Sequence, residues 1–343
     1  MKAILFHQHG GPEVLQYADF DTPAPASGEV QVQIKAASLN RLDLWVRNGW
    51  PGIKLEYPHI TGADGAGVVS ATGEGVTGFA PGDRVVINGT LSCGTCEDCA
   101  SGQDNLCRVR GGVLGEHRRG TLAEYISLPA HNFLKMPESF PFEDAAAASL
   151  VFLTAWHSLM TKGRLQAGES VLIIGAGGGV NTASIQIAKY AGATVCVVGS
   201  SEEKLAKAKA IGADVTFNRT QEDWGKAVFA HTEKRGVDVV VDNVGQETWQ
   251  TSLRSLRRGG RMLVVGNSSG YNVQLDSRLI FGKHLSIIGS TMGTQADFKA
   301  VMTLIFEGKL KAVIDRVMPL SEAAAAETLL EKNEVFGKLA LAP

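Results

Sequence analysis

Four cysteines gather within 15 residues of the chain. Cys93, Cys96, Cys99 and Cys107 follow the spacing C-x2-C-x2-C-x7-C. Four closely spaced thiolates are typical of a tetrahedral zinc site, and four protein ligands close the coordination shell, so we expect a structural zinc. An iron–sulfur cluster and unrelated buried thiols are the alternatives. Cys196 lies inside a predicted strand and is interpreted as a core residue.

A glycine-rich segment carries a second chemical signal. It runs from Gly175 to Asn181, directly after an apolar strand and directly before a helical stretch. Backbone N–H groups and the helix dipole can hold a pyrophosphate there, where side chains would obstruct it. Asn181 stands where a third glycine is expected, which predicts slightly looser packing. The predicted pyrophosphate contacts are Gly175, Gly177, Gly178, Gly179 and Val180.

The end of the following strand bears on the choice of cofactor. An NAD site usually places an acid about 20 residues after the glycines, to bind the ribose 2′-hydroxyl. Gly199 stands at that place and is followed by Ser200, Ser201 and Lys204. Hydroxyls and an ammonium suit a 2′-phosphate, so the sequence favours NADP(H) over NAD(H), with Arg219 as a further candidate for the phosphate.

Composition narrows the classes of protein that these motifs can belong to. The chain has 343 residues, of which 44% are hydrophobic and 20% charged, with a net charge of -2. These values exclude wholesale disorder and make a nucleic-acid partner a poor electrostatic match. The start of the chain lacks a signal-peptide core, and the longest apolar stretch, 145–160, is too short to span a membrane. We therefore expect a cytoplasmic protein of about two domains.

The two parts of the chain differ in periodicity. Residues 1–135 are β-rich, with strands expected at 30–34, 65–69, 84–87 and 123–128 between glycine and proline turns. From residue 145 short apolar strands alternate with helices, which is typical of a doubly wound parallel sheet. Its predicted strands are 171–174, 194–198, 237–241, 261–265 and 285–288, and its helices include 180–191 and 202–211. Later helices near 295–307 and 321–332 precede a strand near 338–341.

Together these motifs resemble the medium-chain dehydrogenase/reductase family along essentially the whole chain. The resemblance implies an α/β protein with three segments: a GroES-like catalytic domain at 1–135, a Rossmann domain at 145–292 that binds NADP(H), and a return to the catalytic domain at 293–343. The four-cysteine motif corresponds to the structural zinc lobe of the family, at 91–110.

The chain departs from the zinc alcohol dehydrogenases of this family at the catalytic metal. Asn40 stands where that branch has a ligating cysteine, Ala63 where it has a histidine, and Leu150 where it has the last ligand. Asp64 takes the place of the glutamate that follows the histidine. Ala63 and Leu150 cannot bind a metal, so we expect no catalytic zinc.

The Asn40-x-x-Asp43 pattern is similar to the quinone oxidoreductase branch, which needs no catalytic metal. The resemblance implies that Asn40 and Asp43 belong to the catalytic site. It also places Trp45 and Trp50 near the substrate, where their flat apolar faces suit a quinone or an enone. Packing within the catalytic domain is the alternative for both tryptophans.

The resemblance also implies cofactor contacts beyond the glycine-rich turn. Thr154 corresponds to a residue that holds the nicotinamide ring, and Lys338 to a basic residue near the pyrophosphate. The remaining positions follow successive strands of the predicted parallel sheet: Asn243, Val244, Gly266, Asn267, Ser268, Ser290, Thr291 and Met292.

These features predict an NADPH-dependent oxidoreductase that transfers hydride to a quinone or to an activated alkene or carbonyl, with Asn40 as the donor to the developing oxyanion. An alcohol dehydrogenase or carbonyl reductase is the alternative within the family, and a non-catalytic NADPH-binding protein is the alternative of another class. The expected partners are a small-molecule substrate and further copies of the chain, in a dimer or tetramer.

Overall fold

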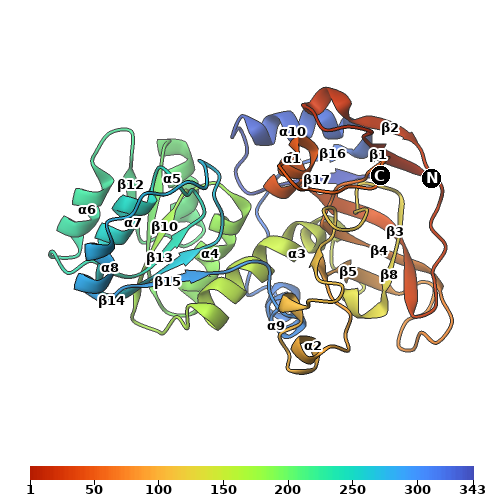
Figure 1. The fold of residues 1–343 in the computed structure, drawn as a ribbon, viewed down its shortest axis with the longest axis horizontal. Coiled ribbons are helices and arrows are strands. Elements are labelled where there is room, and N and C mark those ends of the chain that lie inside the picture. The colour runs from red at the N-terminus through yellow and green to blue at the C-terminus, as the bar shows by residue number, and fades with distance from the viewer. The chain divides into compact units, whose positions relative to one another are not determined.

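The computed structural model describes residues 1–343, and the chain divides into two compact units. Unit 1 comprises residues 1–151 and 294–343, and unit 2 comprises residues 152–293. Helix α3 (Phe142–Trp156) carries residues of both units, which is why the first boundary lies a few residues beyond the predicted 145. Unit 1 is thus built from two separate stretches of chain, whereas unit 2 is continuous (Figure 1).

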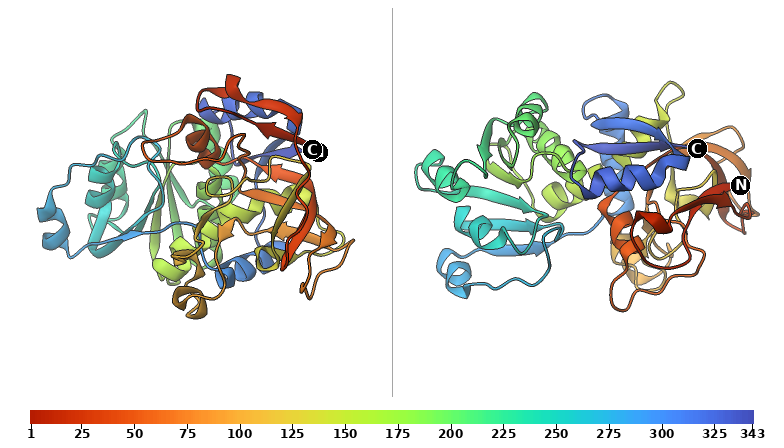
Figure 2. Two further views of the ribbon diagram at one scale, coloured as in Figure 1. Left: turned by 45° about the vertical axis from the view of Figure 1, so that its right-hand side comes forward. Right: turned by 90° about the horizontal axis from the view of Figure 1, so that it is seen from above.

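Unit 1 is organised around a seven-stranded sheet. Strand β17 pairs in parallel with β16 and antiparallel with β3, which brings the late stretch of the chain against the early one. The two views of Figure 2 show both termini close together in this unit. The order is β16-β17-β3-β4-β5-β9, with β8 also paired to β3: β3 (Glu29–Ser38), β4 (Asp64–Thr72), β5 (Arg84–Ile87), β8 (Tyr125–Pro129), β9 (Phe133–Lys135), β16 (Ile314–Pro319) and β17 (Lys338–Ala342).

Short elements complete unit 1. The inward-facing residues of β3, among them Val30, Val32 and Ile34, join one continuous core. Two small antiparallel pairs lie beside the main sheet: β1 (Lys2–Leu5) with β2 (Gln16–Asp19), and β6 (Thr90–Leu91) with β7 (Gly112–Val113). The helices are α1 (Arg41–Asn48), α2 (Glu97–Ala100), α9 (Gln295–Phe306) and α10 (Ala323–Glu331), with 3-10 turns at Pro12–Val14, Asp104–Leu106, Ala130–Asn132 and Leu320–Glu322.

Unit 2 contains a six-stranded parallel sheet of the doubly wound type, as the sequence predicts. Its order β12-β11-β10-β13-β14-β15 reverses direction beside β10, which is the point where such sheets bind ligands. Its strands are β10 (Ser170–Ile174), β11 (Thr194–Gly199), β12 (Val215–Asn218), β13 (Val237–Asp242), β14 (Leu256–Val264) and β15 (Ser286–Gly289). The helices are α4 (Gly179–Tyr190), α5 (Glu202–Ala210), α6 (Trp224–His231), α7 (Trp249–Ser255) and α8 (Ser277–Lys283), together with a π-helix at His157–Lys162.

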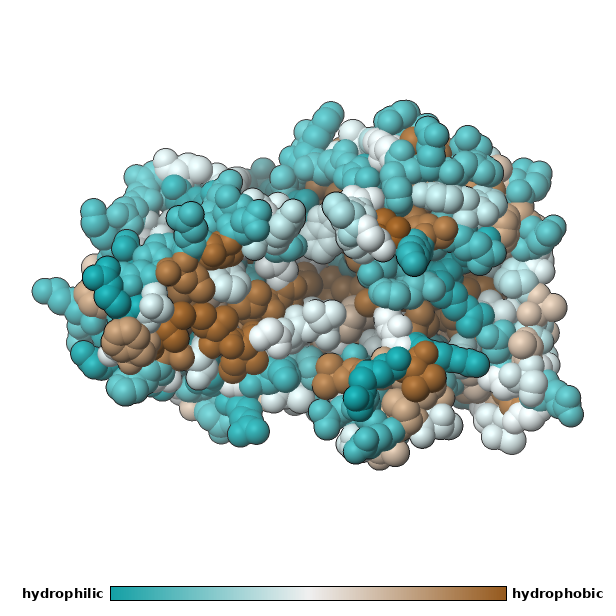
Figure 3. Space-filling model, in the orientation of Figure 1, coloured by the Kyte–Doolittle hydropathy of each residue, from teal (hydrophilic) through white to brown (hydrophobic).

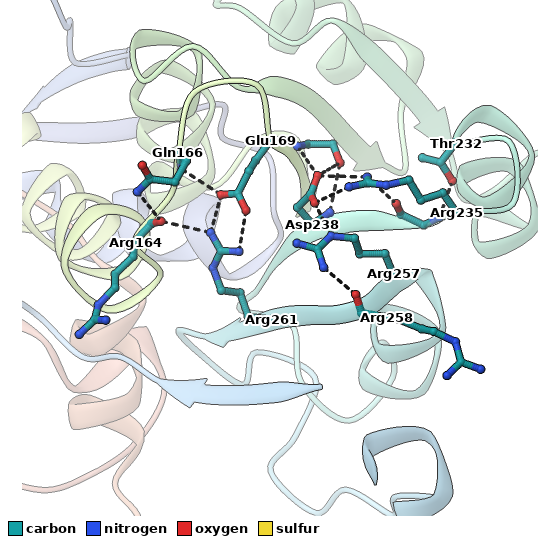
Figure 4. Close-up of polar contacts among 11 residues, drawn as sticks. Arg164, Gln166, Glu169, Thr232, Arg235, Asp238, Arg257, Arg258 and Arg261 are labelled. Carbon is teal, nitrogen blue, oxygen red and sulfur yellow. Dashed lines mark hydrogen bonds and ion pairs between the residues drawn. The ribbon is translucent and has the colours of Figure 1, made fainter. Parts of the chain in front are cut away.

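A cluster of charged side chains links neighbouring strands at the amino-terminal edge of this sheet (Figure 4). The Asp238 carboxylate receives hydrogen bonds from the Arg235 guanidinium at 2.7 Å, from the Arg257 guanidinium, and from the backbone and hydroxyl of Ser170. These donors outweigh burial and hold the pKa of Asp238 well below its usual range. The cluster therefore ties the beginnings of β10, β13 and β14 together.

A second pair extends the same edge. The Arg261 guanidinium donates two hydrogen bonds of 2.9 and 2.5 Å to the Glu169 carboxylate, and it also donates to the backbone oxygen of Gly163. Two parallel N–H···O bonds fix the planes of both groups.

No helix of the structure combines the length and the apolar character needed to cross a membrane.

Candidate functional site

Asn40, Asp64 and Lys338 form a buried polar network in unit 1. Asn40 immediately precedes α1, Asp64 opens β4 and Lys338 opens β17. The Lys338 ammonium lies 2.6 Å from Asn40 Oδ1 and 2.8 Å from Asp64 Oδ2, and Asn40 Nδ2 donates to the same Asp64 oxygen at 2.9 Å. The backbone N–H of Leu150 donates to the other Asp64 oxygen at 2.7 Å. A cation, an amide and a carboxylate therefore meet at one point.

This network occupies the positions that the resemblance assigns to a catalytic metal in related enzymes. An ammonium that is hydrogen-bonded to both Asn40 and Asp64 opposes a second cation at the same point by charge repulsion. Ala63 and Leu150 are buried beside the network and offer no ligand atom. The donor set therefore does not fit a catalytic zinc. It instead presents an amide whose N–H can donate a hydrogen bond to an oxygen atom.

Asp43 supports the network from the first turn of α1. Its two carboxylate oxygens accept from the backbone N–H groups of Asn40, at 2.7 Å, and of Gly62, at 2.9 Å. Burial raises the pKa of Asp43 to about 6, against the opposing effect of these hydrogen bonds and of the Lys338 charge. Because both oxygens are occupied by backbone donors, Asp43 positions Asn40 and is not placed to contact a substrate, which differs from the predicted catalytic role.

Three aromatic side chains near α1 are half-exposed. Trp45 and Trp50 are each 38% exposed, and Tyr57 is 40% exposed. The two predicted tryptophans thus offer accessible apolar faces rather than filling the core. Tyr57, which the sequence analysis did not select, adds a phenol and packs edge-on against Phe6, with ring centroids 5.9 Å apart.

The four cysteines of the zinc motif converge in unit 1. Their sulfur atoms all lie within 4.8 Å of one another, and the closest pairs are 3.5 to 3.9 Å apart. Tetrahedral zinc with Zn–S bonds of about 2.3 Å requires sulfur separations of about 3.8 Å. The backbone N–H groups of Thr95 and Cys96 point at Cys93 Sγ and lower the pKa of its thiol to about 6, whereas burial raises the pKa of the Cys99 thiol to about 12. Cys93, Cys96, Cys99 and Cys107 therefore fit a closed zinc site.

The glycine-rich turn of unit 2 leads from β10 into α4. Gly175 has a φ of 108°, which non-glycine residues rarely adopt, and Gly178 precedes the helix without a side chain that caps it. The first N–H groups of α4 are therefore available to an anion, as expected for Gly177, Gly178, Gly179 and Val180.

Asn181 does not loosen this turn, contrary to the sequence prediction. Its Nδ2 donates to the backbone oxygens of Ile174, at 2.8 Å, and of Gly175, while its Oδ1 accepts from the Asn243 side chain. Asn181 therefore braces the turn against the loop that follows β13. The Asn243 amide takes part in this brace.

The end of β11 is tightly packed at the position where an NAD site has an acidic side chain. A Cβ atom on Gly199 would lie 2.6 Å from Leu205 and 3.0 Å from Ala176. Arg219 begins the loop after the neighbouring strand β12, and its backbone N–H donates to the Gly199 oxygen at 2.9 Å. Ser200 and Arg219 are exposed at this edge, and Ser201 caps α5 by accepting from the backbone N–H of Lys204.

The loops after β13, β14 and β15 lie at the carboxyl edge of the sheet. Asp242 holds the first of them by accepting from the N–H groups of Val244 and Gly245 at 2.9 and 3.0 Å. A hollow of about 370 Å³ is lined by residues of the loops after β13 and β14 and of α7, including Gly266, Asn267 and Trp249. The predicted contacts Val244 and Ser268 belong to the same two loops.

Two predicted cofactor residues carry buried hydroxyls without a hydrogen-bond partner. These are Thr154 Oγ1 on α3 and Ser290 Oγ directly after β15. Two further predicted contacts follow Ser290 in the chain: Thr291 is exposed, and Met292 has a φ of 51°. Buried hydroxyls normally find a partner, so these two fit contacts with a bound molecule. The donor-rich turn, the glycine at 199 and these hydroxyls together fit a dinucleotide.

Fold and site define a class of protein: unit 2 is a nucleotide-binding sheet of the Rossmann type, and unit 1 carries a zinc lobe and a polar catalytic candidate. Family models agree with this assignment. Residues 26–138 match the alcohol dehydrogenase GroES-like domain, and residues 179–307 match the zinc-binding dehydrogenase domain.

Individual relatives narrow the class. A solved structure named NAD-dependent alcohol dehydrogenase is 48% identical, with a TM-score of 0.96 and full coverage of both chains. The acryloyl-coenzyme A reductase of Metallosphaera sedula is 32% identical over 99% of both chains, and the quinone oxidoreductase of Rattus norvegicus is 31% identical over 99% of this chain and 97% of its own. The chain belongs to the medium-chain dehydrogenase/reductase family of zinc-type alcohol dehydrogenase-like proteins, and it is an oxidoreductase.

The structure places Lys338 differently from the sequence prediction. The prediction assigned it to the cofactor pyrophosphate, but its ammonium is buried in unit 1 and bonded to Asn40 and Asp64. Sequence reasoning also missed Asp64 as the shared acceptor. A carboxylate at that position, next to the lost histidine ligand, was the available signal.

Proposed function

We propose that the protein is an NADPH-dependent reductase of quinones or of alkenes and carbonyls activated by conjugation, and that it works without a catalytic metal. The observation that carries this proposal is the Asn40–Asp64–Lys338 network, which puts an amide donor and an ammonium where related enzymes bind zinc. NADPH, when bound, supplies the hydride.

The residues of this chain have to stabilise the negative charge that the acceptor gains. Asn40 Nδ2 uses one of its two N–H bonds on Asp64, so the second remains for the acceptor's oxygen. A preorganised donor of this kind stabilises a developing oxyanion or enolate. Trp45 and Trp50 offer flat, half-exposed faces for a conjugated substrate. Water serves as the source of the final proton.

The names of the relatives support two acceptor classes. One relative is named for the reduction of quinones and another for the reduction of acryloyl-coenzyme A, in which a double bond is conjugated to a carbonyl. Both reactions place negative charge on an oxygen, which is the charge that the Asn40 amide can bind. An alcohol dehydrogenase or carbonyl reductase activity is the second candidate, because the 48% identical structure carries the name alcohol dehydrogenase.

An acceptor screen separates these candidates. Oxidation of NADPH and NADH is followed at 340 nm against quinones, enones, aldehydes and ketones, and the reverse reaction against alcohols. We expect the fastest turnover with quinones or enones. Turnover confined to alcohols and their carbonyl products would overturn the proposed acceptor class. Tight NADPH binding without turnover on any acceptor would instead support a non-catalytic binding protein.

We further infer a preference for NADPH over NADH. Gly199 removes the acid that would repel a 2′-phosphate, while Ser200, Ser201 and Lys204 follow β11 in the chain and the Arg219 backbone is hydrogen-bonded to Gly199. Lys204→Ala should narrow the affinity gap between NADPH and NADH by about 1–3 kcal/mol, the value of a charge-assisted hydrogen bond. Calorimetric titration with both nucleotides measures this gap. Equal affinities in the unmodified protein would contradict the preference, and an unchanged gap in the variant would move the phosphate to Arg219.

We propose that the cysteine lobe holds one structural zinc per chain. A reducing compartment such as the cytoplasm would keep the four thiols from forming disulfides, so that they can bind the metal. Metal analysis should find one zinc for each chain, and chelation should lower thermal stability. Cys196→Ser, a substitution of the one cysteine outside the lobe, serves as the control and should leave the metal content unchanged. Two tightly held zincs per chain would argue for a metal outside the lobe.

An apolar surface of unit 2 supports self-association. Figure 3 shows a brown area over the part of unit 2 that carries β14, β15 and α8 in Figure 1. Phe281 is 69% exposed and Leu275 37%, and β15 is the outermost strand of the sheet, with one edge unpaired. We propose that a second copy of the chain covers this surface. Light scattering should show a dimer or tetramer, and Phe281→Glu should shift it toward the monomer.

A further inference from the structure

Lys338 is the only cation in the buried network around Asn40, and its surroundings define what it can do. The residue is 4% exposed, and Asp64 is fully buried. The ammonium has three protons and three acceptors: the backbone oxygen of Leu39 at 2.6 Å, Asn40 Oδ1 at 2.6 Å and Asp64 Oδ2 at 2.8 Å. No proton is left for a phosphate or for a substrate. Any influence of Lys338 on the chemistry therefore passes through its neighbours.

The neighbours of Asn40 determine how its amide is oriented. Its oxygen faces the ammonium, and its nitrogen faces the Asp64 carboxylate at 2.9 Å. A rotation of the amide by 180° would bring the NH₂ group against the ammonium and the oxygen against the carboxylate, so both contacts would become repulsive. The ammonium and the carboxylate thus act together on opposite ends of the amide and leave one N–H in a fixed direction.

The ammonium also changes the strength of that remaining donor. A positive charge at the amide oxygen withdraws electron density from the nitrogen and makes its N–H bonds more polar. This effect is large in a buried site, where water does not screen the charge. The same amide without its ammonium would be a weaker donor and would be free to rotate.

We propose that Lys338 is a positioning residue that orients and polarises the Asn40 amide, so that its remaining N–H binds the oxygen of the acceptor. The proposal rests on the function proposed above. It assigns to Lys338 a role distinct from binding of the cofactor pyrophosphate, and it makes the ammonium an indirect replacement for a metal charge.

A double-mutant cycle tests this proposal. Lys338→Met keeps an unbranched side chain that is one atom shorter and removes the charge, and Asn40→Ala removes the amide. We expect Lys338→Met to lower kcat at least 10-fold in the unmodified protein but less than 3-fold in the Asn40→Ala background, because the lysine acts through the amide. The dissociation constant of NADPH should change less than 3-fold in every variant.

Controls separate a positioning role from a structural one. Lys338→Gln keeps donors toward the same acceptors and covers the case in which Lys338→Met does not fold; it should also lower kcat at least 10-fold. Lys35→Met changes an exposed lysine of β3 and should leave kcat unchanged.

Three results would overturn the inference. Equal losses of kcat in both backgrounds would show that Lys338 does not act through Asn40. A 10-fold weaker affinity for NADPH, with kcat retained, would return Lys338 to the pyrophosphate. Full kcat in both Lys338 variants would show that the charge is not needed. Failure of the unmodified protein to reduce any acceptor would refute the proposed function itself, which is a separate outcome.

Discussion

Two clusters of buried charge, one in each unit, are both built around aspartate and differ in the donors that surround it. Asp238 in unit 2 is surrounded by two guanidiniums and a serine, and its pKa is lowered. Asp43 in unit 1 has two backbone donors and one distant ammonium, and burial raises its pKa to about 6. The carboxylate with many donors fastens strands of unit 2, whereas the network around Asp43 leaves one N–H of Asn40 without a partner among its members.

The location of each cluster agrees with this contrast. The Asp238 cluster lies at the amino-terminal edge of the parallel sheet, opposite the carboxyl edge where sheets of this type bind ligands. The Asn40 network lies at the beginnings of α1, β4 and β17, and α1 also carries the half-exposed Trp45. The contrast can be tested by mutating one cluster at a time.

The largest effect is expected for Asn40→Ala. Loss of the donor should slow turnover by roughly 100- to 1,000-fold, or about 2.7–4 kcal/mol, with little change in NADPH affinity. Asn40→Asp should be at least as damaging, because it adds a negative charge beside a developing negative charge. Steady-state kinetics and nucleotide titration measure both quantities. Near-normal turnover in both variants would remove Asn40 from the mechanism and direct attention to Trp45, Trp50 and Tyr57.

The opposite pattern is expected for Asp238→Asn. The variant leaves buried donors with a poorer acceptor and should lower the free energy of unfolding by about 1–3 kcal/mol. Turnover per folded molecule should be unchanged. Urea denaturation and kinetics measure these effects, with Glu203→Gln as the control, since its ion pair with Lys207 is exposed and should contribute less than about 0.5 kcal/mol. A loss of turnover without a loss of stability would break the contrast.

The smallest effect concerns pH. The raised pKa of Asp43 means that the folded state binds its proton more tightly than the unfolded state, so its contribution to stability is greatest in acid and is lost as pH rises from about 4 to about 6. The lowered pKa of Asp238 has the opposite sign, and its contribution is lost only as pH falls below about 4.

Each substitution should therefore flatten a different part of the stability profile. Asp43→Asn should remove a slope of about 1.4 kcal/mol per pH unit between pH 4 and 6, and Asp238→Asn should act below pH 4. Urea denaturation at intervals of half a pH unit from 3 to 7 resolves the two ranges. The contrast fails if both variants flatten the same range.

Sequence alone predicted the features that are encoded locally. The four cysteines lie within one lobe and the glycines within one turn, so their spacing already indicated that the cysteines converge and that the turn joins a strand to a helix. The alternation of strands and helices likewise indicated the parallel sheet, although β12 and the π-helix at His157–Lys162 were not predicted, because such short elements leave little periodic pattern.

Features that depend on distant contacts were not predictable in this way. Lys338 lies 298 positions from Asn40, and only the pairing of β17 with β3 brings them together. Asn181 was interpreted by size as a poor substitute for glycine, but its amide spans two strand ends as a brace. Neither contact leaves a pattern in the local sequence.

The division of unit 1 into two stretches of chain has a consequence for folding. Unit 2 is one continuous stretch, so its contacts join residues between 152 and 293 only, whereas the Asn40 network requires closure of a loop of nearly 300 residues. A refolding chain should therefore acquire its nucleotide-binding sheet before β17 docks and delivers the ammonium to the amide. During refolding from urea, the ability to bind a dinucleotide should appear before the ability to turn over an acceptor.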